Sequence, residues 1–170
     1  MKYMSVNYYN KYKEQLYVLH FPGNNIRMEI IHDNLDRKIS IANDVSVISI
    51  MNSVCFHHSF IKKQAERNQF SIVNTAMDEY HWNNVLKIKH IIECLDLLET
   101  KYALIIDGRD TIITNNLDDE FINKYKTFRI PILFNGTQVS HPNVAIEALT
   151  ELVNMRGKAK YLNAGVCIGE

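Results

Sequence analysis

The stretch "YALIIDGRDTII", residues 102–113, decides which fold class is expected for this chain. It opens as a nearly continuous apolar run, stops at Asp107, and reaches a second aspartate, Asp110, three residues later. A continuous apolar run is typical of a central strand that is covered on both faces. The stretch therefore predicts a buried strand with two carboxylates at its carboxyl end.

The sequence before this strand alternates between strand and helix patterns. β-branched residues predict strands at 45–51 and 70–76, and a helix is expected at 55–69. A second helix is expected at 85–100, where apolar residues recur at the three/four spacing of one helix face. This alternation predicts an α/β fold with a mostly parallel sheet and flanking helices. Ligands of such sheets bind beyond the carboxyl ends of the strands, which is where Asp107 is expected.

The remaining sequence predicts an extension and the second half of the sheet. Residues 1–44 contain two strand-like stretches, 15–21 and 26–32, on either side of a "PGNN" turn, and are expected to form a β-rich N-terminal extension. The main domain is expected over residues 45–170. After the aspartates we expect a helix, a strand, a helix and a strand broken by "NAG", at residues 116–128, 130–136, 143–157 and 159–170.

The composition excludes several classes of protein. Basic and acidic residues balance at 19 each, and no basic run is interleaved with aromatics, so nucleic-acid binding is not expected. The three cysteines, Cys55, Cys94 and Cys167, are widely spaced in apolar sequence, which is typical of buried thiols in a reduced protein. No signal-like segment opens the chain and no apolar run could span a bilayer, so we expect a cytoplasmic protein without a membrane span.

Two carboxylates at a strand end can be interpreted in two ways. They could hold Mg²⁺ or Mn²⁺, which prefer oxygen ligands and keep positions open for water or phosphate. Gly108 is expected to let the chain change direction between them, because glycine adopts backbone angles that other residues avoid. Alternatively, Asp107 caps a turn and Asp110 is a solvated surface residue. Neither a P-loop nor a dinucleotide-binding glycine motif is present to supply another phosphate site.

Three stretches, "LIIDGRDTII", "ILFNGTQVSHPN" and "YLNAGVCIGE", occur in this order. Together they resemble a GT-A glycosyltransferase domain, the Rossmann-like fold of nucleotide-diphospho-sugar transferases. The similarity is to the procollagen lysyl hydroxylase and procollagen galactosyltransferase family, with its microbial and viral relatives, and covers about residues 45–170. The resemblance implies that Asp107 and Asp110 bind Mn²⁺ (or Mg²⁺), which bridges the diphosphate of a UDP-sugar.

The same resemblance implies further site residues. Lys87, in "LKIK", resembles a donor-site lysine, and Asn163 and Gly165, in "LNAG", resemble residues that line the sugar and acceptor side. The alternatives, a solvated helix lysine and a strand bulge or turn, stay open. Arg109 stands where family members often carry an aromatic residue against the uracil, and its guanidinium could stack there or contact phosphate.

The reaction that the resemblance implies is transfer of a hexosyl group from a UDP-sugar to an acceptor hydroxyl, on a protein or a glycan. No catalytic base is indicated. Family members continue beyond the "LNAG" strand and supply a histidine as third metal ligand, so a missing C-terminal part and impaired activity are expected for a chain ending at Glu170. The alternative is a catalytically incomplete GT-A-like domain that binds a nucleotide sugar or a partner chain.

Overall fold

The computed structural model describes residues 16–20, 38–81, 83–137 and 161–170. The strand expected at 26–32 and the helix expected at 143–157 lie outside the described residues. The helices and strands, in chain order, are β1 (Val18–His20), β2 (Val45–Ile48), α3 (Ser53–His57), α4 (Phe60–Asn68), β3 (Ile72–Val73), α5 (Asn84–Asp96), β4 (Tyr102–Ile106), β5 (Thr111–Ile113), α6 (Asp119–Lys126), β6 (Ile132–Thr137) and β7 (Tyr161–Gly169).

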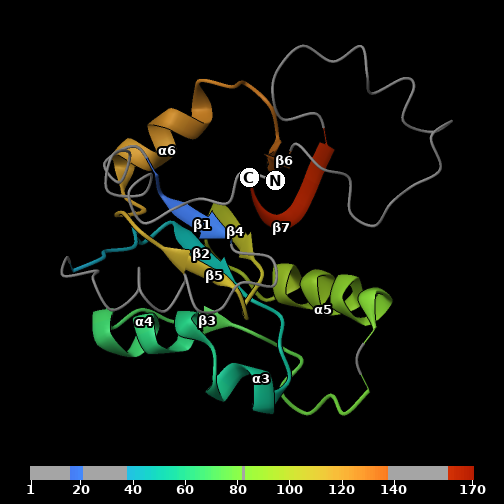
Figure 1. Cartoon of the computed structure of the whole chain (residues 1–170). Coiled ribbons are helices and arrows are strands. Elements are labelled where there is room, and N and C mark those ends of the chain that lie inside the picture. The colour runs from blue at the N-terminus through green and yellow to red at the C-terminus, as the bar shows by residue number, and fades with distance from the viewer. Residues whose placement is uncertain (1–15, 21–37, 82, 138–160) are drawn as a thin grey trace, which may run out of the picture.

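The central sheet has five strands in the order β3-β2-β4-β7-β6 (Figure 1). β2 is parallel to both β3 and β4, whereas β7 is antiparallel to both β4 and β6. Because β6 is antiparallel to β7, it runs in the same direction as β4, and β7 alone runs the opposite way. The expected α/β architecture is therefore confirmed, with a sheet of mixed orientation.

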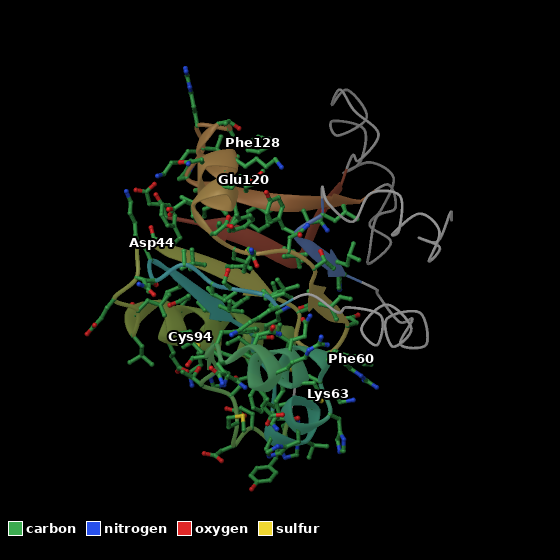
Figure 2. The ribbon with its side chains drawn as sticks, turned by 90° about the vertical axis from the view of Figure 1, so that its left-hand side faces the viewer. Asp44, Phe60, Lys63, Cys94, Glu120 and Phe128 are labelled. Carbon is green, nitrogen blue, oxygen red and sulfur yellow. The ribbon has the colours of Figure 1, made fainter. Side chains whose placement is uncertain are left out.

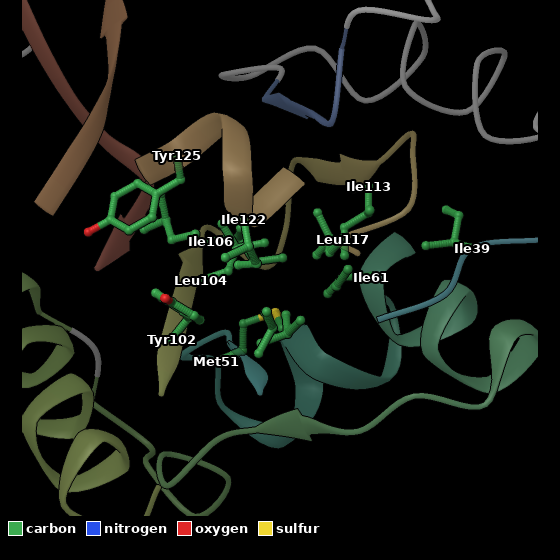
Figure 3. Close-up of a cluster of buried hydrophobic side chains, with 13 residues drawn as sticks. Ile39, Met51, Ile61, Tyr102, Leu104, Ile106, Ile113, Leu117, Ile122 and Tyr125 are labelled. Carbon is green, nitrogen blue, oxygen red and sulfur yellow. The ribbon is translucent and has the colours of Figure 1, made fainter. Parts of the chain in front are cut away.

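The alternation of side chains along β4 explains the layers on either side of the sheet. Leu104 and Ile106 point into the larger core cluster, where they meet Ile61 of α4 and Ile122 of α6 (Figure 3). Ala103 belongs to a smaller cluster on the other face, which is covered by α5. Each fully buried aliphatic side chain of this kind contributes about 1.5–3 kcal/mol. The run is apolar at almost every position because both faces of the strand are covered.

The outer faces of α4 and α6 are polar. Lys63 of α4 and Glu120 of α6 both extend into solvent (Figure 2). In the part of the chain that the structure describes, no helix combines the length and apolarity needed to cross a bilayer.

The helix expected at 55–69 is two helices, so that prediction was wrong in its details. Asn52 caps α3 by accepting a hydrogen bond from the N–H of Cys55 at 2.9 Å. α3 ends at His57, and Ser59 then begins α4, because its hydroxyl accepts from the N–H of Lys62 at 3.2 Å. An N-cap of this kind satisfies a backbone donor that has no partner within the helix, and it favours a new start over continuation.

The last strand, which was expected to be broken at "NAG", is continuous in the structure. Phe134 of β6 pairs with Cys167 of β7, but the next residue, Asn135, pairs with Asn163. Residues 164–166 are thus extra residues on β7, and they form a bulge. The bulge lies beside the end of β4, where the aspartates begin.

A polar cluster around the buried ring of His90 joins α5 to the loop that precedes it. The Nε2 atom of His90 lies 3.2 Å from Glu79, and its Nδ1 atom lies 2.8 Å from Glu93 and 3.0 Å from Thr75. Because a buried polar ring costs free energy unless its nitrogens are paired, these contacts stabilise the loop against the helix.

Candidate metal centre

The site begins where β4 ends. The N–H of Asp107 donates to the carbonyl of Gly165 at 2.7 Å, which extends the β4–β7 ladder by one residue. The neighbouring parallel strand, β2, ends beside it and is followed by Met51 and Asn52. The first aspartate therefore stands at the shared carboxyl edge of two parallel strands, as the sequence predicted.

Gly108 lies closely against the side chain of Met51, and its φ angle is not one that favours glycine. A Cβ atom at this position would lie 2.0 Å from the sulfur of Met51, far inside van der Waals contact. The φ angle of Gly108 lies outside the left-handed region that favours glycine. The expectation that this glycine supplies an unusual backbone conformation was wrong, because what its missing side chain allows is the close approach of Met51.

The N-terminal strand brings a histidine to the two aspartates. β1 pairs antiparallel with β5, and the register sets His20 opposite Thr111, the residue after Asp110. The Nε2 atom of His20 lies 3.4 Å from Oδ2 of Asp107 and 3.3 Å from Oδ1 of Asp110. Its side chain is only 7% exposed, so the ring is held by packing and aimed at the carboxylates.

The donor set fits a divalent cation. One ligand atom from each of His20, Asp107 and Asp110 lies within 4.8 Å of the others. Two ligands at about 2.1 Å from a cation and at right angles to each other are about 3.0 Å apart, close to the separations found here. An imidazole with two carboxylates suits Mn²⁺ or a similar transition ion better than Mg²⁺, which prefers oxygen alone. The partial exposure of both carboxylates, 32% and 20%, leaves room for outer ligands.

Two basic side chains share this site. Lys87 of α5 forms an ion pair with Oδ1 of Asp107. Arg109 lines the same cleft, which has a volume of about 400 Å³. The two bases balance the two carboxylates, so a divalent cation would leave the site with a net charge of about +2. That excess would attract an anionic ligand with two negative charges. The cleft is lined by Ile50, Met51, Asn52, Cys55, Lys87, Asp107, Gly108, Arg109 and Asp110.

A second hollow lies beside the first. It is an apolar groove of about 880 Å³ between α5 and strands β4, β7 and β6. Lys87 lines both hollows, and Cys167 lines the groove. Burial raises the pKa of the Cys167 thiol, although the nearby ammonium of Lys87 acts in the opposite direction. The groove's exposed apolar residues include Ile88, Leu95, Ile132 and Phe134.

The structure brings together most of the residues that the sequence singled out. Lys87, Asp107, Arg109 and Asp110 line one cleft, and Gly165 meets Asp107 through its carbonyl. Asn163 lies in β7 with its backbone paired to β6, and its side chain lies outside the described residues.

His20 was missed by the reasoning from sequence. Its only signal was a histidine inside the strand-like stretch "QLYVLHF", and nothing local states which strand that stretch pairs with. No protein-family model and no curated protein matches the chain, so its function has to be argued from the geometry of the site.

Proposed function

We propose that the chain is a metal-dependent glycosyltransferase of the GT-A type, which moves a hexosyl group from a UDP-sugar to an acceptor hydroxyl. The observation that carries this proposal is the meeting of His20, Asp107 and Asp110 with two basic side chains in one cleft. The position of the cleft, beyond the carboxyl ends of parallel strands, supports a nucleotide ligand. The sheet adds support, because its strands run mostly in one direction.

The reaction requires positive charge near the leaving diphosphate, and the two basic side chains supply it. The bond between the anomeric carbon and the diphosphate oxygen breaks, and its electron pair leaves with the diphosphate. The acceptor oxygen forms the new bond to the anomeric carbon and loses its proton to water. Negative charge grows on the diphosphate, and a divalent cation, when bound, would stabilise it as a Lewis acid. Lys87 and Arg109 place positive charge at the same leaving group, where one such contact is worth about 3–4 kcal/mol, or about 10²–10³ in rate.

The other wall of the cleft offers a place for the nucleoside. Ile50 and Met51 supply apolar surface, and Asn52 and Cys55 lie beside them. A uracil ring could lie on this wall with the guanidinium of Arg109 over its other face.

Binding of UDP in the presence and absence of Mn²⁺ tests the proposal. UDP should raise the melting temperature of the chain only when Mn²⁺ is present, because a ligand that binds the native state stabilises it by mass action. Asp107→Asn and Asp110→Asn should each abolish this shift. Asp96→Asn, which changes an exposed carboxylate at the end of α5, is the matched control and should keep it. A metal-dependent shift that survives in both site variants contradicts the assignment.

A second candidate function is a domain without turnover that binds a nucleotide sugar or a partner chain. The observation that favours a partner chain is the apolar groove, where Ile132 is 50% exposed and Phe134 is 39% exposed. Hydrolysis of UDP-sugars in Mn²⁺ separates the two candidates. Release of UDP supports the transferase, whereas binding of the donor without any release supports the second candidate.

A further inference from the structure

Both oxygens of Asp107 are engaged in the structure. Lys87 pairs with Oδ1, and His20 lies 3.4 Å from Oδ2. The lysine therefore neutralises a carboxylate that a cation would also need. The side chain of Lys87 is only 20% exposed, so this ion pair is partly shielded from water. A cation that approaches Asp107 meets a like charge at close range, which opposes its binding.

The ammonium of Lys87 also has open space to move into. Its side chain lines the metal cleft and the adjoining groove, so open space lies on both sides of the contact with Asp107. A lysine carries its charge on a flexible four-carbon stem and can move the ammonium by several ångströms without any change in the backbone. It can thus release the carboxylate while remaining in the cleft.

We propose that Lys87 couples metal binding to diphosphate binding: it occupies Asp107 in the ligand-free protein and moves to the diphosphate when cation and nucleotide bind together. This inference rests on the proposed function. Without the diphosphate, a bound cation displaces the ammonium into a site that already has excess positive charge. With the diphosphate, the displaced ammonium gains a new anionic partner. Each ligand therefore strengthens the binding of the other by the same factor, as linkage requires.

The coupling predicts that one substitution raises the affinity for Mn²⁺ alone and lowers the effect of UDP on Mn²⁺ binding. Lys87→Gln removes the charge and keeps most of the side-chain length. Mn²⁺ alone should bind this variant about tenfold more tightly than the unchanged chain, since no ammonium competes for Asp107. The factor by which UDP tightens Mn²⁺ binding should fall by about tenfold, since the lysine no longer follows the diphosphate. If Lys87 only held the fold together, or only attracted phosphate, its replacement would not raise the affinity for the metal alone.

Titration of Mn²⁺ into the full chain, followed by electron paramagnetic resonance of the free ion, measures both quantities with and without UDP. Lys89→Gln is the matched control, because Lys89 lies on the same helix, is 61% exposed and pairs with Glu93. It should leave both the Mn²⁺ affinity and the coupling unchanged. Inorganic pyrophosphate in place of UDP tests whether the diphosphate alone is enough, and the inference requires that it produces most of the coupling.

The outcomes distinguish this inference from the proposed function. If Mn²⁺ binds through Asp107 and Asp110 but Lys87→Gln changes neither its affinity nor the coupling, the role of Lys87 is overturned and the metal site stands. If Asp110→Asn leaves Mn²⁺ binding unaltered, the metal assignment fails and the inference fails with it. Tighter binding of the metal alone, together with a smaller coupling factor, supports the inference.

Discussion

Replacing Gly108 with alanine is expected to disturb the lining of the cleft. The added Cβ atom would lie 2.0, 2.1 and 2.6 Å from Sδ, Cε and Cγ of Met51. Since non-bonded heavy atoms are most favourable at about 3.5–4.0 Å, these atoms have to move by about 1.5 Å. Met51 is only 4% exposed and packs within the larger core cluster, so its side chain can move only toward the cleft that it lines. Overpacking of this kind costs about 1–3 kcal/mol.

The cost can be assigned to Met51 by a double-mutant cycle. Met51→Ala removes all three atoms that the new methyl group would meet, and by itself costs about 2–5 kcal/mol as a large-to-small change in a core. In that background Gly108→Ala should add no cost, because the φ angle at this position is open to alanine. The expected coupling energy between the two changes is about 1–3 kcal/mol. Urea unfolding followed by circular dichroism gives the four free energies of unfolding.

Two results would refute this reasoning. If Gly108→Ala lowers the free energy of unfolding by less than about 0.5 kcal/mol, the steric account is wrong. If the cost persists in the Met51→Ala background, the glycine is needed for its backbone conformation instead.

Four further predictions concern the site and its surroundings. His20→Gln should weaken Mn²⁺ binding by about tenfold or more, since it removes one of three protein ligands, and an unchanged dissociation constant contradicts that role. Cys55 lines the cleft, so UDP with Mn²⁺ should slow its reaction with a disulfide reagent; equal rates with and without ligand would place the nucleotide elsewhere. At pH 8 Cys167 should react far more slowly than Cys55, because burial raises the pKa of the Cys167 thiol and lowers its thiolate fraction, and faster labelling contradicts this. His90→Ala should cost about 2–3 kcal/mol in urea unfolding, because Glu79 and two other polar partners lose their contacts, and a change below about 0.5 kcal/mol contradicts it.

The apolar pattern was enough to predict the central strand and the helix before it. Residues 102–106 are apolar because both faces of β4 are covered, and such a run has few other stable positions in a soluble domain. The helix α5 followed from the spacing of its apolar residues, although it ends at Asp96 rather than at residue 100. The apolar pattern did not predict the break at Ser59. One capping hydroxyl outweighed the helical tendency of the sequence on either side.

Within the site, the sequence by itself determined that Asp107 stands at the end of a buried strand with Asp110 three residues beyond it. That outcome depends on local hydrophobicity and on the short reach of the chain between the two residues. Only the tertiary structure decided that His20 joins them, because this depends on the pairing of β1 with β5, segments far apart in the chain. Strand pairing is fixed by the packing of whole faces, and a shift of one residue in register would turn the histidine to the opposite side. The contact between Lys87 and Asp107 is tertiary in the same sense, since it requires α5 to pack against the sheet with that lysine at the edge where β4 ends.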